Sequence, residues 1–326
     1  MTDEAAFRRL VETHEVELRA HCYRMLGSVQ DAEDALQDTL LGAWRGLEGF
    51  EGRSSARTWL YRIATNACVK IIERRPKRVL PMDYGPAADP HDGPSEPVAE
   101  SVWIEPFPDG QLADVLAGPD ARYELRESVE LAFVAALQHL PARQRAVLIL
   151  RDVLGFSGGE VAAVLDTTPE AVYSALQRAH RAIDDDLPER SQQETLRSLG
   201  DRRVRRLVEG YVDAWERDDV DALAAMLTED AAMAMPPQPT WFRGRDAVAE
   251  FLRAVPLGGR LHSRLVPMRA NGQLAFGHYT RDDEGGYTPH GVHVLTLRGS
   301  EIEDMTVFRT PEAVTRVGLP NELAGR

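Results

Sequence analysis

One segment constrains this chain more than any other. Residues 81–120 include PMDYGPAADPHDGPSEPVAE and SVWIEPFPDG, in which Pro, Gly, Asp and Glu dominate. Such a composition buries too little apolar surface to fold alone and predicts a linker. The chain of 326 residues is therefore divided into separate folded parts, and its 43% of apolar residues suffice for a core in each.

Helical periodicity fills residues 1–80, which are almost free of proline, and returns in residues 121–187. A short polar linker, residues 188–200, follows. From residue 201 to 326 two helices precede strand-like alternation with the turn signals NGQ, DDEGG and RGSE. The sequence thus predicts a multidomain protein with two all-α blocks and a C-terminal α+β domain.

Charge is strongly segregated along the chain. The net charge of −14 argues against nucleic acid, but basic residues gather between Arg53 and Arg78 and acidic ones between Asp83 and Asp120. No apolar run approaches the roughly 20 residues of a membrane span, and the N-terminus lacks a signal-type apolar region. The two cysteines, Cys22 and Cys68, lie on predicted helices, so we expect a cytoplasmic protein without membrane association.

Two predicted helices of the first block carry polar faces. The segment DAEDALQDTLLGAWRGL has helical apolar spacing and an acidic opposite face. The segment TWLYRIATNACVKIIERRPKR pairs an apolar stripe with a face of Trp59, Arg62, Asn66 and Lys70. Rings stack on bases, an amide reads a base edge and cations hold phosphates, so this second face suits melted DNA. A solvated acidic face and a merely basic surface helix are the alternatives.

These two segments resemble domain two of the extracytoplasmic-function sigma factors. The resemblance implies that the first helix docks on the β′ clamp helices of core RNA polymerase. It implies that the second helix and its preceding loop capture bases of the minus-ten promoter element. The polymerase-facing residues would be Asp31, Glu33, Asp34, Gln37 and Asp38. The DNA-facing residues would be Phe50, Arg53, Ser54, Arg57, Trp59, Arg62, Asn66, Lys70, Arg74 and Arg75, although relatives usually have an acidic residue in place of Lys70.

The second helical block predicts a helix-turn-helix. Ser157 and Glu160 form an S-x-x-E capping box, Asp166 and Thr167 make the turn, and Thr168 is the N-cap of the second helix. The exposed face of that helix can enter a major groove. A helical hairpin that binds protein is the alternative.

This block resembles sigma domain four, which contacts the minus-thirty-five element and the β flap of polymerase. The stretch LPARQRAVLILRDVLGFS carries the likeness. Tyr173 and His180 depart from the usual pattern, which predicts weaker or more conditional promoter binding. The implied DNA-facing residues are Thr168, Tyr173, Ser174, Gln177, Arg178 and Arg181.

Other features complete the linker and the first block. His14, His21 and Cys22 match no compact zinc pattern, so we expect no metal and no cofactor. An acidic linker of this kind can mimic nucleic acid inside polymerase. Its piece VWIEPFPDG predicts an apolar anchor that docks on a folded domain, with an incidental contact to domain four as the alternative.

Residues 201–326 resemble the SnoaL-like members of the NTF2-like fold. The resemblance implies a cone-shaped α+β domain with an apolar pocket. The lining candidates are Trp215, Met235, Trp241, Phe251, Phe276, Tyr279, His293 and Phe308. Some relatives are isomerases or cyclases, for which Asp230, His262, His278, His290 and His293 offer acid–base groups. They form no evident constellation, so we expect a binding or regulatory module and no catalytic residue.

The sequence therefore predicts an alternative sigma factor that binds core RNA polymerase and promoter DNA and directs transcription initiation. We expect its fused C-terminal domain to regulate it by docking on the sigma domains. A small-molecule ligand and an anti-sigma protein are further candidate partners. The alternatives are an NTF2-like enzyme or ligand sensor with a DNA-binding helical region, and an ordinary helix-turn-helix regulator.

Overall fold

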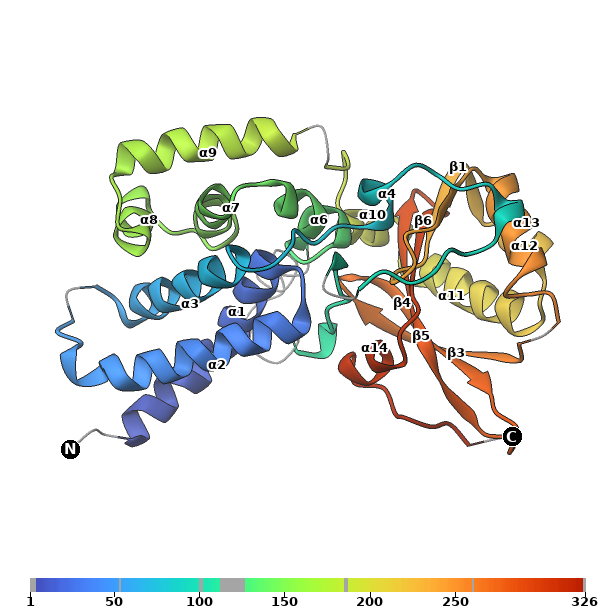
Figure 1. Cartoon of the computed structure of the whole chain (residues 1–326), viewed down its shortest axis with the longest axis horizontal. Helices are drawn as coiled ribbons and strands as arrows, with labels where there is room; N and C mark the ends of the chain where they lie inside the picture. The colour runs from blue at the N-terminus through green and yellow to red at the C-terminus, as the bar shows by residue number, and fades with distance from the viewer. Residues whose placement is uncertain are drawn as a thin grey trace. The chain divides into compact units, whose positions relative to one another are not determined.

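The computed structural model describes residues 4–52, 54–99, 102–111, 127–184, 187–259 and 261–324. The chain divides into two compact units. Unit 1 comprises residues 1–78 and 111–188, and unit 2 comprises residues 79–110 and 189–326 (Figure 1). Much of the segment expected as a linker, residues 81–120, thus belongs to the same unit as the C-terminal domain, while its residues 100, 101 and 112–120 lie outside the described residues.

Unit 1 is helical throughout its described residues. Its first half holds α1 (Glu4–Leu26), α2 (Val29–Gly46), the short η1 (Leu47–Gly49) and α3 (Ala56–Ile72). Its second half holds α6 (Leu131–His139), α7 (Ala142–Leu148), the π-helical η5 (Ile149–Val153), α8 (Gly158–Leu165) and α9 (Pro169–Ile183). The two halves pack together, chiefly through α3 against α8 and α1 against α6.

Side-chain caps fix where these helices begin. The Ser55 hydroxyl accepts a hydrogen bond from the Thr58 amide at the start of α3. The predicted capping box is confirmed, because the Ser157 hydroxyl accepts from the Glu160 amide while the Ser157 amide donates to the Glu160 carboxylate. Asp166 takes a left-handed conformation in the turn, with φ of 50°, and Thr168 caps α9. The helix-turn-helix therefore forms where the sequence predicts it.

Unit 2 combines a six-stranded mixed sheet with helices. Its strands are β1 (Leu227–Ala234), β2 (Trp241–Arg243), β3 (Ser263–Ala270), β4 (Gln273–Arg281), β5 (Tyr287–Arg298) and β6 (Glu301–Phe308). Their order is β2-β1-β6-β5-β4-β3, and only β1 and β6 run parallel. The helices are α10 (Gln192–Leu199), α11 (Asp201–Glu216), α12 (Val220–Ala224), α13 (Arg245–Ala254) and α14 (Pro311–Arg316). The expected class, two all-α blocks and an α+β domain, is confirmed.

The core of unit 2 lies between the sheet and the helices. Tyr211 and Trp215 of α11 pack on Phe276 of β4 and on Met305 of β6, and all four are buried. The segment of residues 79–110 adds α4 (Pro81–Tyr84), η2 (Pro90–Asp92) and the start of η4 (Asp109–Gln111) to this unit. Short pieces of structure therefore form in a segment whose composition predicts none, because it folds against the C-terminal domain.

Candidate nucleic-acid interface

A row of polar side chains follows the exposed face of α3. Arg62, Asn66 and Lys70 are exposed and stand four residues apart, so they share one side of the helix. Leu60, Ala64 and Cys68 are fully buried on the opposite side. Arg74 and Arg75 extend the exposed charge beyond the end of the helix. The pattern read from the sequence therefore exists as a surface, which we call the α3 row: Arg62, Asn66, Lys70, Arg74 and Arg75.

The residues before α3 form a small aromatic platform. The Phe50 and Trp59 rings stack with centroids 4.7 Å apart and an angle of 28° between their planes. Both side chains are half-buried, and Ser54 is exposed beside them. Arg53 lies outside the described residues. A stacked pair with an open edge offers a surface on which an unpaired base can stack.

Arg57 is held differently from the α3 row. Its Nη2 donates to the Leu154 carbonyl oxygen at 3.2 Å, and its Nε lies 3.4 Å from a Glu17 carboxylate oxygen. Its guanidinium also lies over the Phe156 ring, 4.4 Å from the centroid. The structure therefore uses Arg57 to join α3 to the turn before α8, and the side chain is half-buried.

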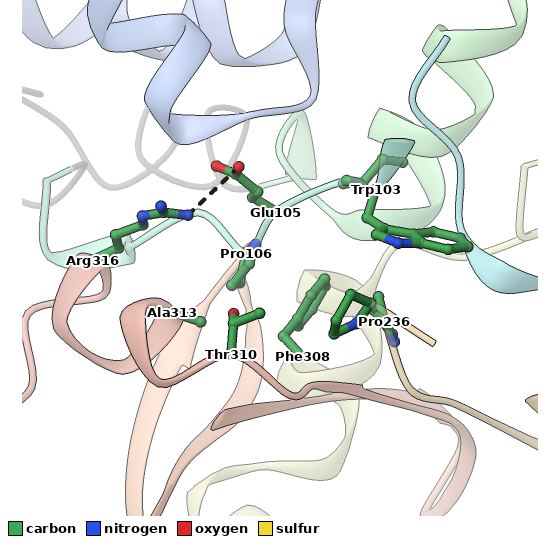
Figure 2. A pocket seen from close by; sticks show the side chains of 10 residues that line it. Trp103, Glu105, Pro106, Pro236, Phe308, Thr310, Ala313 and Arg316 are labelled. Atoms are coloured by element: carbon green, nitrogen blue, oxygen red, sulfur yellow. Dashed lines mark ion pairs between the residues drawn. The ribbon is translucent and has the colours of Figure 1, made fainter. Parts of the chain in front are cut away.

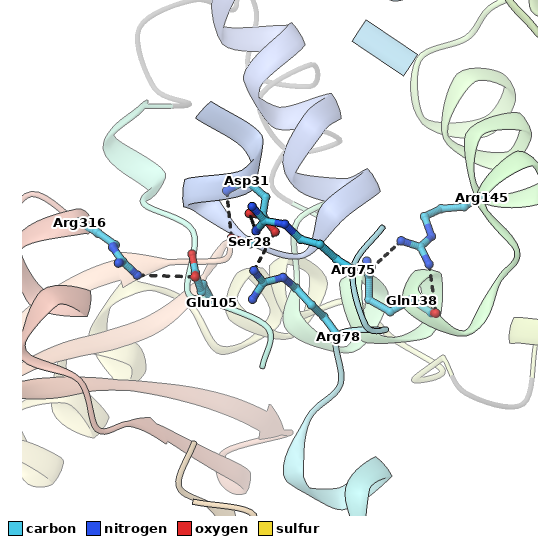
Figure 3. Close-up of polar contacts among 8 residues, drawn as sticks. All are labelled: Ser28, Asp31, Arg75, Arg78, Glu105, Gln138, Arg145 and Arg316. Carbon is cyan, nitrogen blue, oxygen red and sulfur yellow. Dashed lines mark hydrogen bonds and ion pairs between the residues drawn. The ribbon is translucent and has the colours of Figure 1, made fainter. Parts of the chain in front are cut away.

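The acidic residues of α2 fall into two groups. Asp34, Gln37 and Asp38 are exposed, whereas Glu33 is half-buried and its carboxylate pairs with Arg19 at 2.6 Å. Asp31 is only 2% exposed. Figure 3 shows its carboxylate directed at Arg75 and Arg78, with 2.7 Å to the Arg78 Nη2. The expectation that Asp31 faces a partner is therefore corrected for this arrangement, because ion pairs within the unit bury it.

Two apolar side chains extend the exposed part of α2. Leu41 is 53% exposed and Trp44 is 39% exposed, although both are large and apolar. They continue the side that carries Asp34, Gln37 and Asp38, and the Trp44 ring meets the Phe7 ring edge to face. The sequence reasoning missed them, although helical spacing from Asp34 through Asp38 points to Leu41. Exposed apolar residues beside acidic ones are typical of a protein-docking surface.

The recognition helix α9 carries the second polar face. Val172, Ala175, Ala179 and Ile183 are buried. All six of the expected DNA-facing residues are exposed, namely Thr168, Tyr173, Ser174, Gln177, Arg178 and Arg181. Tyr173 is 66% exposed, which is unusual for a large aromatic side chain. We call these six the α9 face.

His180, one of the two departures noted in the sequence, has a local partner. Its Nε2 lies 2.6 Å from an Asp152 carboxylate oxygen of η5. The pair joins the recognition helix α9 to η5, which precedes α8 in the chain. His180 is therefore engaged in a local polar contact within this helical block.

The eight expected pocket residues of the C-terminal domain are all buried, and four of them belong to one apolar cluster, namely Trp215, Met235, Phe251 and Phe276. The Trp215 ring of α11 meets the His293 ring edge to face, with centroids 4.7 Å apart, and Phe276 of β4 lies in the same core. The Phe251 ring stacks on Phe242, and the Tyr279 hydroxyl donates to the Pro320 carbonyl oxygen. The remaining two are Trp241 and Phe308, of which Phe308 lines a small cavity described below.

A row of polar side chains crosses this core, which we call the histidine row. The Tyr211 hydroxyl lies 2.9 Å from His293 Nδ1, and His293 Nε2 lies 3.2 Å from His278 Nδ1. His278 Nε2 then lies 2.9 Å from the Ser263 hydroxyl. Burial, and then the nearby His290, lower the pKa of His293 to about 3, so this imidazole is neutral at neutral pH.

The other acid–base candidates lie beside the histidine row or on the surface of the domain. The His290 ring lies 4.8 Å from His278, and burial lowers its pKa to about 4. Asp230 is exposed and pairs with Arg298, and His262 is exposed. The polar contacts recorded within the described residues join the histidine row to hydroxyl, sulfur and imidazole groups, with no carboxylate among them.

The apolar anchor of the linker is buried in unit 2. Trp103 is 3% exposed and Phe107 is fully buried. The Phe107 amide donates to Asn271 Oδ1 at 2.8 Å, and the Asn271 amide donates to the Phe107 carbonyl oxygen at 2.9 Å. Asp109 accepts from the Gly272 amide at 2.8 Å. These contacts pair the anchor with the turn between β3 and β4.

Further contacts hold the rest of the segment. The Trp241 Nε1 donates to the Gly85 carbonyl oxygen, and the Ser95 amide donates to the Thr240 hydroxyl, both at 2.8 Å. In Figure 2 the Glu105 carboxylate faces the Arg316 guanidinium of α14 at 3.6 Å. The cavity that Glu105, Arg316 and Phe308 help to line has a volume of about 30 Å³, which is room for little more than one water molecule. The segment therefore fills this face of the domain.

No cluster of three or more potential metal ligands occurs within the described residues. His21 contacts the Thr65 hydroxyl at 3.0 Å and meets the Tyr61 ring, so it has a packing role between α1 and α3. No helix of the described chain is long and apolar enough to cross a membrane.

Comparison with known proteins agrees with this arrangement. Residues 10–78 match the sigma-70 region 2 family, residues 130–183 match sigma-70 region 4, and residues 208–305 match the SnoaL-like domain. The chain is 41% identical to the ECF RNA polymerase sigma factor SigG of Mycobacterium tuberculosis, over 97% of this chain and 85% of the relative. The chain belongs to the ECF sigma factors.

Other relatives share less of the chain. The ECF sigma-E factor of Escherichia coli is 28% identical over 56% of this sigma factor and 86% of its own length. The crystal structure of the sigma factor SigJ of Mycobacterium tuberculosis is 20% identical, with a TM-score of 0.59, over 97% of this chain and 99% of that one. That similarity shows the fold. The protein is thus an alternative sigma factor, which binds core RNA polymerase and promoter DNA to direct transcription initiation.

Proposed function

We propose that each of three exposed surfaces of unit 1 binds a different target of this sigma factor: core polymerase, the minus-ten element or the minus-thirty-five element. The exposed part of α2, with Asp34, Gln37, Asp38, Leu41 and Trp44, docks on the β′ clamp helices of core polymerase. The combination of apolar side chains and acidic rim supports this role, because burial of the former drives association and the latter selects a basic partner.

The α3 row and the Phe50–Trp59 platform bind the melted minus-ten element. Exposed cations hold phosphates, the Asn66 amide reads a base edge, and the stacked rings accept an unpaired base. The α9 face enters the major groove of the minus-thirty-five element, where Gln177 and Arg178 are suited to reading base edges. Arg57 belongs to this machinery only after its contacts to Leu154 and Phe156 are released.

We further propose that unit 2 regulates the factor by holding residues 79–110. The two promoter elements lie about 25 base pairs apart, which is roughly 85 Å of duplex at 3.4 Å per pair. Thirty-two residues can span up to about 110 Å when extended, but not while they are folded on the C-terminal domain. In unit 1 the two helical blocks that must reach the two elements are packed together. Release of the segment would lengthen the chain that is available to connect the two blocks and would thereby favour full promoter engagement.

The buried anchor supports this proposal and supplies its test. Trp103→Ala and Phe107→Ala remove the two largest rings of the anchor from a surface where both are buried. We expect the double variant to raise promoter-specific transcription with core polymerase several-fold, because the linker is freed. The exposed Arg217→Ala of unit 2 is the matched control and leaves transcription unchanged.

Two results would contradict this proposal. Unchanged transcription by a double variant whose C-terminal domain remains folded by circular dichroism would contradict regulation through the segment. Lowered transcription would contradict it as well, and would show that the bound segment is needed for activity. Neither result bears on the assignment of the family.

The C-terminal domain is proposed to act without catalysis. The polar groups of the histidine row contact one another, and the acid–base candidates Asp230 and His262 lie on the surface. Turnover of a ketone substrate that is lost on His293→Gln would overturn this view. Because the proposed partner is core RNA polymerase, we place the protein in the cytoplasm.

A further inference from the structure

A cavity in unit 1 concentrates positive charge. It has a volume of about 410 Å³ and lies where the end of α3 meets the turn between α6 and α7. Four cationic side chains line it, from Arg75, Lys77, Arg78 and Arg145, against one carboxylate, that of Asp31. Its lining therefore carries an excess of about three positive charges.

Arg145 is the most unusual of these cations. It is 4% exposed, and its Nη1 and Nη2 donate to neutral oxygens of Met25, Gln138 and Leu140. Its Nε has no hydrogen-bond partner within the described part of the chain. Figure 3 shows the side chain beside Gln138. Burial lowers the pKa of Arg145 to about 10, which still leaves it a cation at neutral pH.

A buried cation with only neutral partners is costly, and a nearby anion lowers that cost. The single lining carboxylate is already engaged. Asp31 pairs with Arg78 at 2.7 Å and with Arg75. Lys77 Nζ lies 2.8 Å from His139 Nδ1. Because its lining holds four cationic side chains and one carboxylate, the cavity favours an anion with more than one negative charge.

The rest of the lining is apolar. Leu26, Ile71, Ile72, Leu140 and Pro141 supply aliphatic walls beside the cations. An inorganic anion has no apolar surface to bury against these side chains, whereas a purine ring packs well on them. The volume also lies within the range of small-molecule sites in proteins. A lining that combines cations with an aliphatic surface fits a ligand that carries both phosphates and a flat ring, as a nucleotide does.

We propose that this cavity binds a nucleoside diphosphate, with the phosphates against Arg75, Lys77 and Arg145 and the base against the aliphatic wall. The cavity is lined by the first helical block through α3 and by the second through α6 and α7. The ligand therefore contacts both blocks only while they are packed together. By thermodynamic reciprocity, a ligand of the packed form favours that form over a separated one.

Calorimetric titration of the full chain with GDP, ADP and inorganic phosphate tests this proposal. We expect GDP or ADP to bind more tightly than inorganic phosphate. Lys77→Gln removes an exposed cation of the lining and is expected to weaken nucleotide binding about tenfold. Ala142→Trp places a large ring at the cavity wall without changing charge and is expected to abolish binding.

Arg143→Gln is the matched control, because Arg143 is exposed on the same helix as Ala142 and does not line the cavity. It is expected to leave the affinity unchanged. Failure of both nucleotides to bind at millimolar concentration would overturn the proposal, as would inorganic phosphate binding as tightly as GDP. Equal weakening by Arg143→Gln would overturn it too, by assigning the effect to net charge.

A last arm separates nucleotide from nucleic acid. If Lys77→Gln weakens promoter binding by the sigma–polymerase complex while the wild-type chain ignores GDP and ADP, the cations serve the DNA backbone and the proposal is wrong. The titration requires no polymerase, so its result is independent of the transcription test for the linker.

Discussion

The α3 row of unit 1 and the histidine row of unit 2 are both lines of polar side chains, but they lie in opposite environments. Arg62, Asn66 and Lys70 are in solvent, whereas His278 and His293 are buried and contact one another. An exposed cation loses little by meeting a phosphate, while a buried imidazole must stay neutral or pay for desolvation. The first row is therefore suited to binding, and the second to holding a sheet and a helix together.

The largest expected effect is a loss of stability of unit 2 on acidification, because its buried histidines must then bind protons. Burial lowers the pKa of His293 to about 3 and of His290 to about 4, below the ordinary 6.5 of an unfolded chain. Their stabilising contribution is complete above pH 6.5 and is lost as the pH falls toward these values, because the unfolded chain then binds more protons. Between pH 7 and pH 5 we expect a loss of about 2 kcal/mol per histidine.

Hydrogen exchange of the β4 and β5 amides at the two pH values measures this loss. His290→Gln removes one titrating group from a half-buried position, so its pH dependence should be smaller by about 2 kcal/mol. The amides of α3 serve as an internal reference. An unchanged pH dependence in His290→Gln would show that other groups cause the acid sensitivity.

Neutralising the exposed row tests the other half of the comparison. The triple variant Arg62→Gln, Lys70→Gln, Arg74→Gln removes three cations that are exposed on or just beyond α3. We expect promoter affinity of the sigma–polymerase complex to fall about 30-fold, roughly 2 kcal/mol, with a shallower salt dependence. The thermal midpoint of the free protein should hardly change, because none of the three side chains is buried.

The matched control is Arg202→Gln, Arg205→Gln, Arg206→Gln on the exposed side of α11. It changes the net charge of the chain by the same amount at a place to which we assign no DNA contact. Equal weakening by the two triple variants would assign the effect to total charge, and the α3 row would lose its special role.

What the sequence could predict follows the same contrast. Helical spacing is local, so the face of Arg62, Asn66 and Lys70 and the capping box of Ser157 follow from a few adjacent residues. The ion pairs of Asp31 with Arg75 and Arg78 join positions more than 40 residues apart, and the anchor at Phe107 meets Asn271 across the chain. Such partners depend on how the elements pack, so periodicity could not assign them.

The C-terminal domain shows the limit most clearly. A list of large apolar residues and histidines predicts which side chains are buried, and all eight of the expected pocket residues are buried. It does not predict which of them share a space. Trp241 faces residues 79–110, Phe251 stacks within the helix–sheet core, and His293 joins a polar row. Strand register and the bound segment decide this, and neither is local.

The smallest expected effect concerns a carboxyl group on the same sheet, with the opposite sign. Burial, and then the nearby Glu303 carboxylate, raise the pKa of Asp304 on β6 to about 7. An unfolded Asp titrates near 4, so the fold prefers the protonated form and loses stability as the pH rises from about 4 to about 7. Asp304→Asn keeps the shape of that neutral form and removes the penalty.

We expect Asp304→Asn to stabilise unit 2 by about 1 kcal/mol at pH 8 and by less than half as much at pH 5. The full shift would give more, but Asp304 is half-buried and Arg243 and Arg298 act against it, so solvent and charge screening reduce the gain. Urea unfolding at the two pH values measures both terms. A gain that is equal at pH 5 and pH 8 would show that packing of the amide, rather than titration of the carboxyl group, stabilises the variant. Since His290 and His293 reduce the stability of unit 2 at low pH and Asp304 reduces it at high pH, we expect unit 2 to be most stable between these two limits.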